Sequence, residues 1–236
     1  MGSTTVLLLW PLLLSVVWSQ SVITDAGPNE FPYVVKINLK GMGFPKTEAA
    51  VVVSKRYILA SGNTKTLELS NLDVTDQSGK VRPIARAEAF LSYKFAYLKV
   101  CEKFEGATMP MTASSFNDLS ADVNSTGFLL FFNASSHVLR KLPASAMSTA
   151  NCAKADGGNY LCTYQDSTPG YCSFYTDDTP SYTNTPLIAF GNQVQGRMYG
   201  PACDSKTGDM SGSWTFHNYA HHSQSIISNV PEVDIK

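Results

Sequence analysis

The side chains best suited to acid–base or metal chemistry are the four histidines: His137, His217, His221 and His222. His217 and His221 are four residues apart, and on a helix that spacing places two imidazoles on one face, where they can bind zinc. No carboxylate or cysteine follows at a spacing that would complete such a ligand set. We therefore interpret this histidine group as a solvent-facing helical surface and expect no bound metal and no cofactor.

Three other patterns suggest chemistry only weakly. Ser181 could act as a nucleophile, but no Gly-x-Ser-x-Gly context surrounds it. Residues Asp73–Gly79 resemble a calcium loop but lack its closing glutamate, so we interpret them as a turn. A group of basic residues could bind a polysaccharide, although a solvated strand face is the simpler interpretation: Lys36, Lys40, Lys46, Lys55 and Arg56.

The chain carries the marks of an oxidising, extracellular compartment. Residues Val6–Trp18 are apolar but fewer than the roughly 20 needed to span a bilayer, which is typical of a signal peptide. The small residues Val17 and Ser19 place cleavage after Ser19, although the stretch lacks a preceding lysine or arginine, and a buried strand or helix is the alternative. Two N-x-S/T sequons, at Asn124 and Asn133, predict glycosylation.

Composition excludes several classes of protein. The chain has 236 residues, 16% of them charged and 44% hydrophobic, with a formal net charge of −1. A net charge near zero gives no bulk attraction to nucleic acid or anionic lipid. The hydrophobic content predicts a folded chain rather than a disordered one. We expect one domain over residues 20–236, no nucleic-acid partner and no membrane insertion.

The mature chain consists of short β-rich segments separated by Gly, Pro, Asn and Ser. This pattern predicts an all-β sandwich or barrel, with strands at Tyr33–Leu39, Ala49–Val53, Tyr57–Ala60, Phe95–Val100, Gly127–Phe132 and Pro186–Phe190. Residues 104–126 have few strand signals and are interpreted as the connection between two β halves. Near the C-terminus, apolar and small residues spaced as on one helical face predict a helix: Phe216, Tyr219, Ala220, Ser223, Ile226, Ile227 and Val230.

Taken in order, several segments resemble the motifs of chymotrypsin-like (trypsin-fold) serine proteases. They are Glu30–Val35 ("FPWVV"), Ala49–Thr64 ("GGSLIS..WVLTAAHC"), Lys94–Val100 ("DIALLKL"), Pro186–Ile188 ("GPLV"), Gln195–Gly200 ("GIVSWG") and Gly212–Thr215 ("GVYT"). Their order covers nearly the whole mature chain. The resemblance implies two packed antiparallel six-stranded β-barrels with a C-terminal α-helix.

The resemblance also implies a disulfide pattern. Cys152 and Cys162 resemble the pair that brackets a loop before the nucleophile, and Cys172 and Cys203 resemble the pair that joins the nucleophile loop to a later strand. The family's pair around the histidine loop is absent, and its two positions are Glu48 and Thr64. Cys101 matches no family position. We expect it to be unpaired within the chain, either as a buried small hydrophobe or as the site of an intermolecular disulfide.

The positions that carry catalysis in this family hold other residues here. The base, the orienting carboxylate and the nucleophile fall on Asn63, Lys94 and Thr183. An amide cannot accept a proton near neutral pH, and a lysine would oppose an imidazolium. Counting forward from Cys172 moves the nucleophile position to Thr176, with no serine or following glycines.

The family's activation mechanism is missing as well. No lysine or arginine lies between Ser19 and Val35, and the aspartate that would pair with the freed amine is Tyr182.

These substitutions predict a secreted pseudoprotease, similar to insect-type serine protease homologues that act as cofactors, decoys or scaffolds in immune cascades or reproductive secretions. Its expected partner is a secreted protein, such as an active protease or its substrate. The insertion Tyr175–Tyr182 offers two tyrosines for such a contact, or is only a solvated loop. The alternative function is an unorthodox hydrolase that uses Thr183 or Ser181.

Overall fold

The computed structural model describes residues 23–27, 29–40, 46–92, 94–109, 126–132, 136–147, 160–163, 184–198 and 214–232. The expected signal peptide, both sequons and most of the expected connection between the two halves lie outside these ranges. Structural statements below refer to the described residues.

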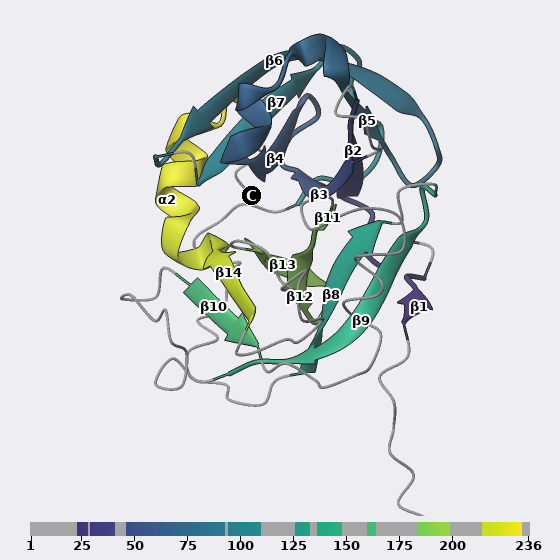
Figure 1. The fold of residues 1–236 in the computed structure, drawn as a ribbon, viewed down its shortest axis with the longest axis vertical. Helices are drawn as coiled ribbons and strands as arrows, with labels where there is room; N and C mark the ends of the chain where they lie inside the picture. The colour runs from purple at the N-terminus through teal and green to yellow at the C-terminus, as the bar shows by residue number, and fades with distance from the viewer. Residues whose placement is uncertain are drawn as a thin grey trace, which may run out of the picture.

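The first half of the chain forms a closed antiparallel barrel, at the top of Figure 1. Its strands are β2 (Val34–Leu39), β3 (Lys46–Val52), β4 (Tyr57–Ser61), β5 (Leu72–Thr75), β6 (Val81–Phe90) and β7 (Phe95–Val100). They are ordered β3-β2-β5-β6-β7-β4, and pairing of β3 with β4 closes the ring. Two short 3₁₀ helices, η1 (Gly62–Thr66) and η2 (Leu69–Asn71), connect β4 to β5. Closure leaves the barrel with no unpaired edge strand.

The second half forms a curved sheet of the same kind. Its strands are β8 (Thr126–Phe132), β9 (Leu139–Ser145), β10 (Tyr160–Thr163), β12 (Leu187–Phe190), β13 (Gln193–Met198) and β14 (Trp214–Asn218), with β1 (Thr24–Asp25) added at the outer edge of β9. The order is β9-β8-β12-β13-β14-β10. Directly after β9, Ala146 forms a β-bridge with Thr163, and the Met147 amide donates to the Cys162 carbonyl at 2.9 Å. The sheet therefore curls back on itself.

The two barrels share one face, which we call the inter-barrel seam. Strand β8 shows why, because it is buried on both sides. Leu129 and Phe131 pack into a core inside the second barrel, whereas Leu130 and Phe132 belong to a larger core that continues into the first barrel. A strand buried on both faces has a nearly continuous apolar sequence, which explains the segment Gly127–Phe132.

Backbone and side-chain hydrogen bonds also cross the seam. The two-residue strand β11 (Asn184–Thr185) precedes β12 of the second barrel but pairs in parallel with β3 of the first. The Tyr33 hydroxyl donates to the Asn192 carbonyl at 2.7 Å and accepts from the Val194 amide at 3.2 Å. Burial raises the pKa of this hydroxyl to about 12, so it remains a donor at physiological pH.

Helix α2 (Tyr219–Asn229) is the last element of the described chain. It extends from the second barrel along the first (Figure 1). It begins where the Asn218 side chain accepts a hydrogen bond from the Ala220 amide at 2.9 Å. Its buried face is Tyr219, His222, Ser223 and Ile226. None of the described helices combines the length and the apolar character needed to cross a bilayer.

The predicted all-β fold with two barrels and a C-terminal helix is confirmed. Each predicted strand is present within one to three residues at its ends. Two predictions are wrong in detail. The helix does not include Phe216 or His217, because the Asn218 cap follows β14. Residues Asp73–Thr75 belong to strand β5, so only the residues from Asp76 to Gly79 form the predicted turn.

Candidate functional site

Strand register brings two of the three expected triad positions together. Ser61, the last residue of β4, is the partner of Phe95, the first residue of β7. Asn63 follows in η1 and Lys94 directly precedes β7, so both lie at the same end of this strand pair. Thr183 is outside the described residues, as are Ser181, Thr176 and Tyr182. The peptide that follows it, Asn184–Thr185, pairs with Thr47 and Glu48 of β3.

A hydrogen-bonded pair joins the two positions where the resemblance expects a disulfide. The Thr64 hydroxyl donates to Glu48 Oε2 at 2.8 Å, and the Ser61 amide donates to Glu48 Oε1. Glu48 is only 4% exposed. Burial raises the pKa of its carboxyl, against the opposing effects of the Arg197 charge and these hydrogen bonds. The pair thus connects β3 to η1 without sulfur.

A cation from the second barrel lies against the Lys94 position. The Arg197 side chain extends from β13, is buried, and donates through Nη1 to the Lys94 carbonyl at 2.9 Å. Its Nε has no hydrogen-bond partner among the described residues. The Arg197 charge helps to lower the pKa of both Glu48 and His217. Positive charge therefore lies at the end of the β4–β7 pair where the resemblance expects the aspartate and the imidazole of the triad.

Two buried imidazoles lie next to this charge but are poor bases. Burial, then the charges of Arg197, His222 and Lys94, lower the pKa of His217 to about 3. Burial, then Lys94 and His221, lower that of His222 to about 4. Both rings pack against Phe95, with centroid distances of 5.6 and 5.3 Å. A general base works best with a pKa near the operating pH, so these histidines are poorly suited to activate a hydroxyl near pH 7.

The histidine prediction is therefore wrong in its structural basis. His217 belongs to β14 and is 3% exposed, His222 is 6% exposed, and only His221 of the three is solvent-exposed. They do not form a solvated helical face. Within the described ranges, no group of three potential metal ligands comes together.

The basic cluster does not form one solvated patch either. Lys36 is buried, and its Nζ donates across the seam to the Ser136 carbonyl at 2.7 Å. Lys40 pairs with Asp73 at 2.5 Å. Lys55 is exposed on the turn between β3 and β4. The side chain of Lys46 is outside the description.

Two of the five cysteines lie in the described ranges. Cys162, in β10, is disulfide-bonded. Cys101 is free and exposed, so the expectation that it is a buried small hydrophobe is wrong. Cys152, Cys172 and Cys203 are outside the description, and the pairings Cys152–Cys162 and Cys172–Cys203 stay predictions. So do the glycosylation sites and the insertion Tyr175–Tyr182.

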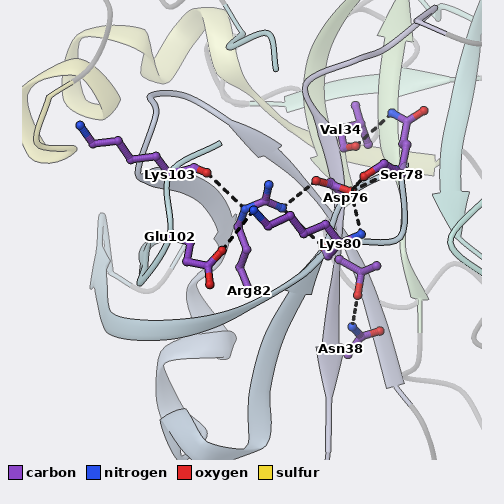
Figure 2. A network of polar contacts seen from close by, with 10 residues as sticks. Val34, Asn38, Asp76, Ser78, Lys80, Arg82, Glu102 and Lys103 are labelled. Carbon is purple, nitrogen blue, oxygen red and sulfur yellow. Dashed lines mark hydrogen bonds and ion pairs between the residues drawn. The ribbon is translucent and has the colours of Figure 1, made fainter. Parts of the chain in front are cut away.

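Sequence reasoning missed a cavity of about 600 Å³ at the seam. The β5–β6 turn and residues 104–107 of the first barrel form one side, and residues 137–139, which lead into β9, form another. Asp76 and Arg82 are joined there by an ion pair of 2.7 Å (Figure 2). The signal in the sequence is the turn that begins at Asp76, which resembles a calcium loop without its closing glutamate. Lys94, the one expected triad position whose side chain is described, does not line this cavity.

Solved structures with this fold include both active and inactive proteins. The Vibrio cholerae VesB protease superimposes with a TM-score of 0.63 at 13% identity, over 88% of this chain and 67% of that one. An inactivated protease paralogue of the scabies mite gives 0.61 at 8% identity, over 85% of this chain and 96% of that one. Human heparin binding protein superimposes with a TM-score of 0.60 at 10% identity, over 91% of this chain and 98% of that one. The sequence matches no protein-family model and no curated protein.

Proposed function

Because the chain has the trypsin-like serine protease fold, we propose that it is a secreted, catalytically inactive serine protease homologue that acts by binding another protein. The observation that carries the proposal is the hydrogen bond from Arg197 to the Lys94 carbonyl. It fixes a guanidinium beside Lys94, at the end of the β4–β7 pair where the resemblance expects the aspartate and the imidazolium, and like charges close together oppose each other.

The comparisons support the same proposal at the level of the fold. The scabies mite protein has the fold and is described as an inactivated protease paralogue. A trypsin-like scaffold therefore persists in a protein described as having lost its activity. For this chain we propose a role as cofactor, decoy or scaffold in an extracellular pathway, such as an immune cascade or a reproductive secretion. The partner would be an active protease or the substrate of one.

Fluorophosphonate labelling tests the absence of catalysis. The full-length protein is purified from the medium of secreting cells and treated with a fluorophosphonate probe, with trypsin as the positive control. We expect no more labelling than in the double variant Ser181→Ala/Thr183→Ala, because the buried imidazoles His217 and His222 have pKa values too low for a base near pH 7. Stoichiometric labelling that this double variant removes would overturn the proposal in favour of an unorthodox hydrolase.

A further inference from the structure

In the seam cavity, the Arg82 guanidinium uses two of its three nitrogens in hydrogen bonds to described residues. Arg82 is 2% exposed and lines the cavity. Its Nη1 donates to Asp76 at 2.7 Å and to the Lys80 carbonyl at 3.4 Å, while Nε donates to the Lys103 carbonyl at 3.4 Å (Figure 2). No acceptor among the described residues reaches Nη2, the third nitrogen. The guanidinium carbon lies 4.6 Å from the centroid of the Phe104 ring, which holds the group in place.

The carboxylate beside this donor already accepts four hydrogen bonds. Asp76 Oδ1 accepts from the amides of Ser78 and Lys80, each at 3.0 Å, and from the Ser78 hydroxyl. Oδ2 accepts from Arg82. The Asp76–Arg82 pair is neutral overall, and the other charged lining residues, Lys80 and Glu105, cancel formally. A neutral acceptor, such as a carbonyl, therefore suits Nη2 better than a strongly anionic group.

Four lining residues are apolar and buried, and we call them the floor: Val35, Val52, Phe104 and Leu139. Polar residues line the cavity as well, among them Asn29, Gln77, Ser78 and His137. On the rim, Val138 is 40% exposed, and a Cβ added at Gly106 would meet nothing within 4 Å. The volume of about 600 Å³ lies within the range of about 300–1,000 Å³ that small-ligand pockets usually have.

We propose that the seam cavity binds a short, extended and uncharged peptide segment of the protein partner. One apolar side chain of the segment packs on the floor, and a neighbouring backbone carbonyl accepts from Arg82 Nη2. In a peptide, an apolar side chain and a backbone carbonyl lie close together. This arrangement matches the cavity, where Arg82 Nη2 lies beside the apolar floor. This inference rests on the proposed protein-binding function and gives it a docking surface whose described lining does not include Lys94.

The test uses a displayed library of random linear seven-residue peptides, selected on the full-length secreted protein. Enriched peptides are then measured against three variants. Val138→Trp fills the cavity from its rim. Val81→Trp is the matched control, because Val81 is 53% exposed and outside the lining. Arg82→Lys retains a cation for Asp76 but removes Nη2. Thermal melts confirm that each variant is folded.

We expect enriched peptides that share an apolar residue and that lose about tenfold or more in affinity with Val138→Trp and with Arg82→Lys, as for a central contact. Their affinity for Val81→Trp should be unchanged. If no peptide is enriched, or if the enriched peptides bind Val138→Trp as tightly as the natural protein, the cavity assignment is wrong, whereas the absence of fluorophosphonate labelling would still stand. Conversely, labelling would overturn the proposed function without altering the peptide result.

Discussion

At the scale of single residues, the contact between Glu48 and Thr64 is the feature that can be predicted best from the sequence. Both residues occupy positions where the resemblance expects a disulfide. The resemblance assigns both residues to one cross-link, and the structure places their side chains in direct contact. The sequence could not reveal that the Ser61 amide shares this carboxylate, because that contact depends on the turn from β4 into η1. The position of Arg197 near Glu48 could not be predicted either. The two residues are 149 positions apart along the chain, and only the fold brings them to the same junction.

Replacing Thr64 by valine should show how much the hydroxyl contributes. Valine keeps the shape of the side chain but leaves the buried Glu48 carboxylate without one of its donors. We expect the free energy of unfolding to fall by about 1–3 kcal/mol in urea titrations at pH 7. Thr64→Ser retains the hydroxyl and removes one methyl group, so its loss should be about 1 kcal/mol or less. Equal losses in the two variants would contradict a role for this hydrogen bond.

At the scale of elements, the strands predicted from sequence share one property. Strands such as β4, β7 and β8 are buried along most of their length, so their sequences are continuously apolar. Strands β6 and β9 were not predicted because basic residues and a proline interrupt the apolar residues of each, and proline is a strand-breaking signal. Pro83 and Pro143 nevertheless occupy register positions opposite Asp73 and Phe128.

The docking of α2 makes stability depend on pH. His217 precedes the helix and His222 lies on its buried face. The pKa of each is lowered in the folded state, to about 3 and about 4, from the ordinary value of 6.5. Below pH 6.5 the unfolded chain therefore binds protons that the folded chain does not, and the free energy of unfolding falls as the pH falls. Each histidine contributes a slope of about 1.4 kcal/mol per pH unit within that window.

We expect urea titrations between pH 6.5 and pH 4 to show this loss of stability. His222→Phe keeps an aromatic ring against Phe95 and removes one titrating group, so its slope should be shallower than that of the natural protein. The exposed neighbour offers a control, because His221→Ala should leave most of the slope in place. Parallel slopes for His222→Phe and the natural protein would show that His222 does not titrate differently in the two states.

At the scale of the whole molecule, the seam should make the two barrels unfold together. The shared core, strand β11 and the side chains of Tyr33, Lys36 and Arg197 all cross it. Two of the three tryptophans, Trp10 and Trp18, lie in the expected signal peptide, so Trp214 in β14 is the only one in the mature chain. Its fluorescence reports on the second barrel, whereas far-UV circular dichroism averages both.

We therefore expect the two signals to give the same urea midpoint, as a two-state transition requires. Tyr33→Phe removes two hydrogen bonds across the seam and should lower both midpoints equally. Two separate midpoints in the natural protein would mean that the barrels are independent units, and the seam cavity would then lose the rigid walls that peptide binding needs.

Glu48 and Thr64 are linked by a hydrogen bond and not by a disulfide. The two barrels therefore differ in whether they need an oxidant to form their covalent links. No cysteine lies between the start of β2 and the end of β7, and four of the five cysteines follow residue 150. The first barrel can therefore complete its covalent structure without any thiol exchange, as soon as its strands leave the ribosome. Cys162 of the second barrel is disulfide-bonded, so mild reductants would act on that half of the molecule.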